Sequence, residues 1–257
     1  MAFVCVAGRR LEYEWVYPDG QRAPAQGPTL VFLHEGLGSV ALWKDFPERV
    51  ARATECAVLM YSRYGHGKSD PLSEPRTVDY LHREALVALP GVLSALSVSD
   101  PILIGHSDGA SISIIFAASN AVQGLVLMAP HVFVEDIAVA SIAQARTRFE
   151  DREVSTKLAR YHDDANATFR GWNDIWLHPD FRFWNIESML PSITAPMLLI
   201  QGEDDQYGTV AQVEAVSRGV RGPAQILVLP CCAHSPHIDQ PTLTIEAIAR
   251  FVKEVKQ

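Results

Sequence analysis

The amino-acid sequence predicts a doubly wound, mostly parallel α/β sheet with an N-terminal hairpin and an inserted helical cap. Short, continuously apolar runs alternate with longer segments of helical character along most of the 257 residues, which is typical of strands covered by helices on both faces. Strand-like runs stop between residues 131 and 193, where helical segments and aromatic residues gather instead. The apolar content of 48% is enough for one large core, so we expect a single domain that carries this insertion.

The N-terminal part of the chain is expected to form a hairpin followed by a strand, a helix and a second strand. Residues 3–7 and 11–17 are β-rich runs separated by a short glycine-containing turn, which predicts the hairpin. A proline- and glycine-rich connection follows at residues 18–28. The next strand, helix and strand are expected at residues 29–33, 43–53 and 57–61.

Helices and buried strands continue to alternate to the end of the chain. Thr77 is a suitable N-cap for the next helix, which runs to about Leu96 and which Pro90 kinks or divides. Further strands are expected at residues 102–104, 125–128, 196–201 and 224–229. Further helices are expected at residues 134–150, 154–169 and 209–220, and a last one starts at Pro241. Residues 1–130 and 194–257 thus form the predicted core, and residues 131–193 form the predicted helical cap.

Composition excludes several classes of partner. The formal charge is −8 with no basic cluster, which argues against nucleic acid or an anionic membrane as a partner. We find neither a signal peptide nor an apolar run of membrane-spanning length. The four cysteines lack the spacing of a disulfide framework, so a cytoplasmic protein with reduced thiols is expected. The oligomeric state stays open.

A glycine-flanked serine marks the expected functional centre. Gly105 and Gly109 lie two residues on either side of Ser107, between a buried strand and a helix. This pattern is typical of a nucleophile elbow, a strained turn that presents the serine oxygen above the sheet at the positive end of the helix.

A serine nucleophile needs a base and a carboxylate that orients the base. Asp204 and Asp205 follow one strand and His234 follows the last strand, so all three are expected at the same sheet edge as Ser107. Structural, packing or solvated roles are assigned to His34, His66, His82, His106, His162 and His178. No metal-ligand spacing is present, and no metal is predicted.

With these residues in place, the chain resembles the α/β-hydrolase superfamily over nearly its whole length. The matching segments are HEGLGS at residues 34–39, GHSDG at 105–109, GEDD at 202–205 and AHSPHIDQP at 233–241. The resemblance implies Ser107 as nucleophile, His234 as base and Asp205 as the acid, with Asp204 as the alternative acid. It also implies catalysis without a cofactor.

The same resemblance implies an oxyanion hole built from main-chain amides. The amide of Asp108 is expected to supply one donor, and Gly36, with Leu37 as the alternative, the second. The pocket candidates are Glu35, Asp108, His131, Trp176 and His237.

Two residues depart from the family pattern. Many relatives carry glycine at the position of Glu35, and we expect its carboxylate to point outward or to pair with a base such as Arg63. Asp108 is expected to be an acid favoured at a helix start. The alternative is that its carboxylate reaches the pocket and selects substrates with an amino group.

The function implied by these residues is hydrolysis of small carboxylic esters or related acyl compounds through an acyl-enzyme. The alternatives are a carbon–carbon bond hydrolase or lyase that uses the same triad on a small metabolite, and a small-molecule receptor with slow turnover. The fold hosts many reactions and does not choose between them.

Overall fold

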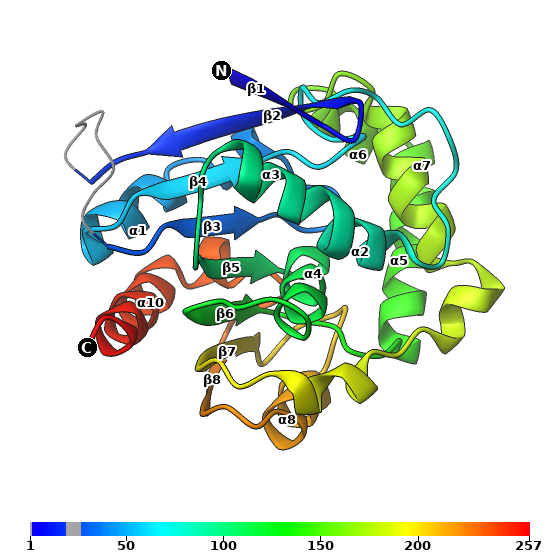
Figure 1. Cartoon of the computed structure of the whole chain (residues 1–257). Helices are drawn as coiled ribbons and strands as arrows, with labels where there is room; N and C mark the ends of the chain where they lie inside the picture. The colour runs from blue at the N-terminus through cyan, green and yellow to red at the C-terminus, as the bar shows by residue number, and fades with distance from the viewer. Residues whose placement is uncertain (1, 19–26) are drawn as a thin grey trace.

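An eight-stranded sheet runs through the protein (Figure 1), whose computed structural model describes residues 2–18 and 27–257. The strand order is β1-β2-β4-β3-β5-β6-β7-β8. β1 and β2 form an antiparallel hairpin, β2 pairs antiparallel with β4, and the remaining pairs are parallel. The strands are β1 Ala2–Val6, β2 Arg9–Val16, β3 Leu30–Leu33, β4 Val58–Tyr61, β5 Ile102–His106, β6 Gly124–Met128, β7 Met197–Gly202 and β8 Ala224–Leu229. The predicted fold class is confirmed.

Helices connect the parallel strands. The α-helices are α1 Phe46–Thr54, α2 Tyr80–Arg83, α3 Leu89–Ala95, α4 Asp108–Ala117, α5 Asp136–Glu150, α6 Glu153–Leu158, α7 Ala165–Trp176, α8 Val210–Gly219, α9 Pro236–Asp239 and α10 Pro241–Val255. Shorter helical turns are η1 Val40–Trp43, η2 Glu84–Ala88, η3 Pro179–Phe183 and η4 Glu187–Ser192.

The strands read as continuous apolar runs because both faces of the sheet are covered. Leu30 and Phe32 of β3 belong to a core that they share with α1 and α10. Val31 and Leu33, which alternate with them, belong to a core on the other face that includes residues of α3, α4 and α8. Every residue of β3 through β7 is buried. Close packing on both faces makes the sheet rigid, and the residues at its carboxyl edge are therefore held in fixed positions.

The chain between β6 and β7 forms helices over the carboxyl edge of the sheet. Figure 1 shows α5 and α7 on the right, on the side toward which the arrows of β3 and β5 point. α5 and α7 also pack against each other. These helices lie where parallel strands of open α/β sheets place their ligands.

The helix predicted after Thr77 differs at its start and is divided as expected. Thr77 is not an N-cap: α2 begins at Tyr80 after Asp79, and the Thr77 hydroxyl donates to the Asp79 carboxylate instead. The π-helical turn η2 separates α2 from α3, and Pro90 stands in the first turn of α3, so the predicted division near Pro90 is confirmed.

The predicted helix at residues 154–169 is two helices. α6 ends at Leu158, and α7 begins at Ala165 because the Asp164 carboxylate accepts the Ala167 N–H at 2.8 Å. The helix predicted at residues 43–53 begins three residues later, after η1.

Most of the predicted connection at residues 18–28 lies outside the described residues. In the described part of the chain, helices are too short or too polar to cross a membrane. Cys5, Cys56, Cys231 and Cys232 are free thiols.

Candidate active site

Ser107 stands on a strained turn between β5 and α4. Its φ of 54° and ψ of −117° are rare for a residue with a side chain. Its N–H donates to the Met128 carbonyl at 2.9 Å, which ties the turn to β6. A Cβ on Gly109 would lie 1.9 Å from the Leu33 carbonyl oxygen, so only glycine lets α4 pack this closely on β3. Backbone geometry therefore fixes the serine at the carboxyl edge of the sheet.

His234 joins Ser107 to Asp205. Its Nε2 lies 2.9 Å from the Ser107 hydroxyl, and its Nδ1 lies 2.9 Å from both Asp205 carboxylate oxygens. The Asp205 carboxylate also accepts the Tyr207 N–H at 2.8 Å and the Gln201 side-chain amide at 2.7 Å. An Nδ1 that donates to a carboxylate leaves Nε2 of a neutral ring free to accept the serine proton.

Two contacts between a carboxylate and a histidine shift the pKa values around His234: Asp205 with His234, and Glu35 with His106. Burial raises the pKa of Asp205, but the hydrogen bond and charge of His234 outweigh it and hold that pKa below its usual value. His106 Nε2 donates to the His234 carbonyl at 2.7 Å, and its Nδ1 lies 3.5 Å from the Glu35 carboxylate. Burial lowers the pKa of His106, but the hydrogen bond and charge of Glu35 outweigh it and raise that pKa above its usual value. Burial raises the pKa of Glu35, but the hydrogen bond and charge of His106 outweigh it and lower that pKa.

A cavity of about 200 Å³ opens beside the serine. Aromatic and aliphatic side chains from α5 and α7 form much of its wall, and polar groups stand on the sheet side. Its lining residues are Glu35, Gly36, Leu37, Ser107, His131, Ala138, Ile142, Trp172, Trp176, Tyr207 and His234. Trp172 approaches Gly36 so closely that a Cβ there would lie 2.2 Å from the indole.

The loop of residues 35–38, which follows β3, presents its carbonyl oxygens to buried donors. The Glu35 oxygen accepts from Arg63 Nη2 at 2.8 Å. The Gly36 oxygen lies 3.0 Å from Nε2 of His66, and the Leu37 oxygen lies 3.0 Å from Nε2 of His162. Because C=O and N–H point in opposite directions in a trans peptide, these bonds turn the N–H groups of Gly36 and Leu37 the other way.

Those N–H groups are available to a ligand. Within the described chain, the amides of Gly36, Leu37 and Asp108 donate to no protein acceptor. Unpaired main-chain donors are uncommon in buried surroundings and call for a partner. Gly36 and Leu37 line the cavity together with Ser107, and the Asp108 amide is the next one along the chain from Ser107.

The histidines that hold the loop are neutral. Burial and nearby positive groups lower the pKa of His66 well below its usual value, and burial also lowers that of His162. His162 Nδ1 accepts the Gly67 N–H at 2.9 Å, which leaves the proton on Nε2 for the Leu37 oxygen. The His162 ring is therefore a fixed donor to the loop. Nδ1 of His66 lies 3.4 Å from Arg76 Nη2 and 3.1 Å from the Tyr64 oxygen, and with Nδ1 accepting from Arg76 the Nε2 proton is directed at the Gly36 oxygen.

Comparison with known proteins identifies the family. A family model described as "Alpha/beta hydrolase family" matches residues 30–247. The chain belongs to the alpha/beta hydrolase family. It is 26% identical to a 2-(acetamidomethylene)succinate hydrolase of Mesorhizobium japonicum over 90% of each protein. A match of 32% identity to protein phosphatase methylesterase 1 of Bos taurus covers 43% of the chain and 28% of that protein. The enol-lactonase from Burkholderia xenovorans LB400 superposes with a TM-score of 0.76 at 18% identity, over 98% of this chain and all of that one.

Within this alpha/beta hydrolase, the sequence-predicted residues fall into two groups. Ser107, Asp205 and His234 form one hydrogen-bonded chain. Asp204, the alternative acid, lies outside it. Three pocket candidates, Glu35, His131 and Trp176, line the cavity. Burial lowers the pKa of His131 to about 3, so this wall of the cavity is uncharged at neutral pH.

Two pocket candidates do not line the cavity. The Asp108 carboxylate is buried and accepts from Tyr80 Oη at 2.9 Å and Trp176 Nε1 at 3.2 Å, and Asp108 is not among the residues that line the cavity. His237 packs behind the site, with ring centres 5.0 Å from Trp43 and 4.9 Å from His106.

Glu35 was expected to point outward or to pair with a base such as Arg63, and the base that its carboxylate faces is His106 instead. The Glu35 carboxylate faces His106, and Arg63 binds the main-chain oxygen of Glu35 and lies 3.6 Å from the Asp108 carboxylate. Glu35 is also 28% exposed and reaches the cavity wall.

Sequence reasoning missed the side chains that hold the loop. Arg63 and His66 lie in a glycine-punctuated segment at the carboxyl end of β4, a position that could have marked them. His162 and Tyr80 carried no local signal, because each meets the site only through tertiary packing. No group of three or more acidic, histidine or cysteine side chains in the described residues is placed to hold a metal ion.

Proposed function

We propose that this alpha/beta hydrolase is a serine hydrolase of small carboxylic esters or related acyl compounds. The observation that carries the proposal is the hydrogen-bonded chain from Ser107 through His234 to Asp205 at the wall of a cavity. A serine hydroxyl becomes a nucleophile when a base lies within hydrogen-bond reach, and this base has its own carboxylate partner.

The proposed reaction proceeds in two halves. His234 Nε2 takes the proton of Ser107 as its oxygen attacks the acyl carbon, and Asp205 stabilises the imidazolium that forms. The amides of Asp108 and of Gly36 or Leu37 donate to the negative oxygen of the tetrahedral intermediate. The intermediate collapses to an acyl-enzyme as His234 protonates the leaving alcohol. Water, deprotonated by the same histidine, then releases the acid and restores Ser107.

The cavity favours a small substrate without strong negative charge. Its volume of about 200 Å³ lies below the range of roughly 300–1,000 Å³ that is usual for drug-sized ligands. Neither lysine nor arginine appears among its described lining residues, and Glu35 contributes a carboxylate. The relative from Mesorhizobium japonicum is named for a succinate derivative. A dicarboxylate of that kind would meet no cation in this cavity, so we propose an uncharged acyl compound instead.

The test is hydrolysis of chromogenic esters from acetyl to octanoyl by the wild type and by Ser107→Ala. We expect turnover that is highest for short acyl chains and that falls at least 10³-fold in the variant. Ser113→Ala is the matched control, because Ser113 is a buried serine of α4, the helix that follows Ser107, and its hydroxyl donates to the Gly109 carbonyl. A hemisuccinyl ester tests charge and should react more slowly than a butyryl ester of similar length. Equal activity of wild type and Ser107→Ala would refute the proposal.

A further inference from the structure

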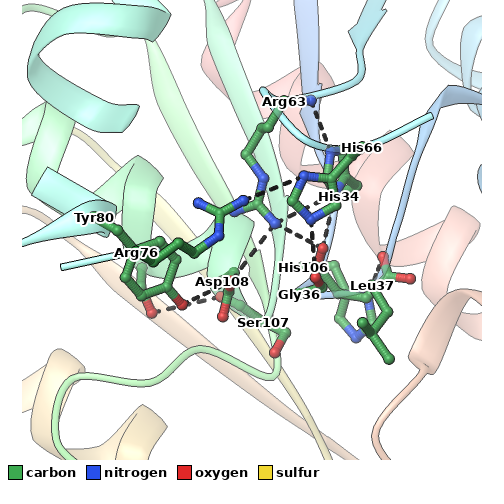
Figure 2. A network of polar contacts seen from close by, with 12 residues as sticks. His34, Gly36, Leu37, Arg63, His66, Arg76, Tyr80, His106, Ser107 and Asp108 are labelled. Carbon is green, nitrogen blue, oxygen red and sulfur yellow. Dashed lines mark hydrogen bonds and ion pairs between the residues drawn. The ribbon is translucent and has the colours of Figure 1, made fainter. Parts of the chain in front are cut away.

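Arg63 is a buried cation that the catalytic cycle described above does not use. It follows β4, and its side chain is 1% exposed. Its Nη2 donates to the Glu35 carbonyl at 2.8 Å and lies 3.6 Å from the Asp108 carboxylate. Its main-chain N–H donates to Nε2 of His34 at 3.0 Å. Figure 2 shows the guanidinium between His34 and Asp108.

The partners of Arg63 are the two segments that carry the proposed oxyanion donors. Glu35 shares a peptide group with the Gly36 N–H, and Asp108 carries the other N–H on its own main chain. Holding the Glu35 oxygen fixes the plane of that peptide, and therefore the direction of the Gly36 N–H. Holding the Asp108 carboxylate restrains the first residue of α4. A single nitrogen atom of Arg63 thus spans both segments.

Two further hydrogen bonds hold the Asp108 carboxylate in place. Its carboxylate also accepts from Tyr80 Oη at 2.9 Å and from Trp176 Nε1 at 3.2 Å. Arg63 is the cation within 4 Å of this buried carboxylate in the described chain. A carboxylate with two neutral donors and one cation is well satisfied, so it is a firm anchor for the guanidinium.

Arg63 itself is poorly satisfied elsewhere. Its Nε and Nη1 atoms are buried without a hydrogen-bond partner in the described protein. Leaving nitrogens of a buried guanidinium unpaired costs stability, and the contact with the Asp108 carboxylate offsets part of that cost. The nitrogen that has partners is Nη2, which lies between the two segments.

We propose that Arg63 is a positioning residue of the oxyanion hole: it ties the 35–38 loop to Asp108 and so sets the separation of the amides that donate to the substrate oxygen. This inference rests on the proposed function. It assigns Arg63 no contact with substrate. Its effect is expected in the transition state, where the oxyanion exists, and not in substrate binding.

The experiment compares Arg63→Met, Arg63→Lys, Asp108→Asn and the double variant Arg63→Met/Asp108→Asn. For ester hydrolysis we expect Arg63→Met to lower kcat at least tenfold while KM changes less than threefold. Lysine keeps one charged donor and should recover part of kcat. Arg146→Met is the control, because Arg146 loses bonds to Asn173 and Asp174 on α7 without touching the loop or Asp108.

The double variant separates positioning from stability. Arg63→Met alone leaves the Asp108 carboxylate buried without its cation, so its Tm should fall. Asp108→Asn removes that unpaired charge and keeps one oxygen as acceptor for Tyr80 Oη, while Trp176 Nε1 still has Tyr80 Oη as an acceptor at 2.9 Å, so the Tm of the double variant should return toward the wild-type value. The kcat of the double variant should stay low, because the Glu35 oxygen keeps His34 Nδ1 at 2.7 Å and the Gly38 N–H at 3.0 Å but has lost the donor that also reaches residue 108. Recovery of kcat together with Tm would overturn the inference.

Phosphonylation of Ser107 by a nitrophenyl phosphonate supplies a second readout that needs no turnover. Its rate depends on the activated serine and on the same amides, so Arg63→Met should slow it at least tenfold. A reactive wild type with an equally reactive Arg63→Met overturns this inference and leaves the proposed function intact. A wild type that neither hydrolyses esters nor reacts with the phosphonate overturns the proposed function, and the inference about Arg63 falls with it.

Discussion

The two sides of the candidate site are held in place by different means. On the Ser107 side, main-chain geometry fixes the serine, through a strained turn, the hydrogen bond from its N–H to the Met128 carbonyl and the packing of Gly109 on β3. On the side of the 35–38 loop, side chains do the work, since Arg63, His66 and His162 each bind one successive carbonyl oxygen. A rigid backbone turn tolerates little change, whereas side-chain supports can be removed one at a time. Substitutions should therefore affect the two sides differently.

The largest effect is expected from Gly109→Ala on the Ser107 side. The new Cβ would lie 1.9 Å from the Leu33 carbonyl, and neither strand nor helix can move without disturbing the core. We expect a loss of about 3 kcal/mol or more, measured as a fall in Tm or as insoluble protein. Gly8→Ala is the control, because Gly8 has a φ of 76° but no atom within 4 Å of the added carbon. It should cost only about 1–2 kcal/mol. Equal stability of the two variants would contradict the contrast between the two sides.

A smaller effect, on rate and not on folding, is expected from His66→Ala. It removes the donor to the Gly36 oxygen and lets the peptide that carries the Leu37 N–H rotate. Losing an oxyanion donor outright costs roughly 10²–10³ in kcat, so loosening one should cost about tenfold. Steady-state kinetics on the preferred ester would measure it. His82→Ala serves as the control, since His82 lies on α2 and makes no hydrogen bond to the loop in the described part of the chain. If both variants keep the wild-type kcat, the loop does not depend on His66.

His162→Ala should lower kcat less, by about threefold. The peptide that it holds, between Leu37 and Gly38, is also fixed inside the loop, because the Gly38 N–H donates to the Glu35 oxygen at 3.0 Å. The same kinetic assay would rank the two histidines. A larger loss for His162→Ala than for His66→Ala would mean that the internal turn of the loop does not support it.

The smallest effect is a change in acid sensitivity. The pKa of His66 lies well below its value in the unfolded chain, so the unfolded chain binds protons first as the pH falls below about 6.5, and stability is lost with them. His66→Gln keeps a donor for the Gly36 oxygen but cannot titrate. We expect near wild-type kcat and a smaller fall in Tm between pH 7 and pH 5, by about 2–4 °C, which is the effect of roughly 1 kcal/mol in a chain of this size. His106, whose raised pKa acts in the opposite direction, is common to both proteins and cancels. An unchanged slope would show that His66 does not contribute to it.

The same contrast explains what the sequence could and could not predict. The serine turn is encoded locally, by glycines two residues from Ser107, and the strand ends that bring Asp205 and His234 to it follow from alternating apolar runs. The supports of the 35–38 loop come from residues 28 to 125 positions away, and no local pattern marks such contacts. Asp164 is a cap that the sequence analysis missed, because an aspartate directly before a helical run is a recognisable N-cap that would have divided the helix predicted at residues 154–169.

Hydrogen bonds between residues 162–168 and the segment after β4 limit which parts of this protein can be exchanged with those of a relative. Besides His162, the Asp163 N–H donates to the Gly67 oxygen at 3.0 Å, and the Thr168 hydroxyl donates to the Gly65 oxygen at 2.7 Å. A chimera that exchanges residues 131–193 for the corresponding segment of another hydrolase would break these joints along with the support of Leu37. A segment that is to be transferred between hydrolases therefore has to include residues 62–69 as well as 131–193, although residues 62–69 lie more than sixty positions earlier in the chain. Hydrogen bonds, and not position along the chain, decide which residues belong to this exchangeable unit.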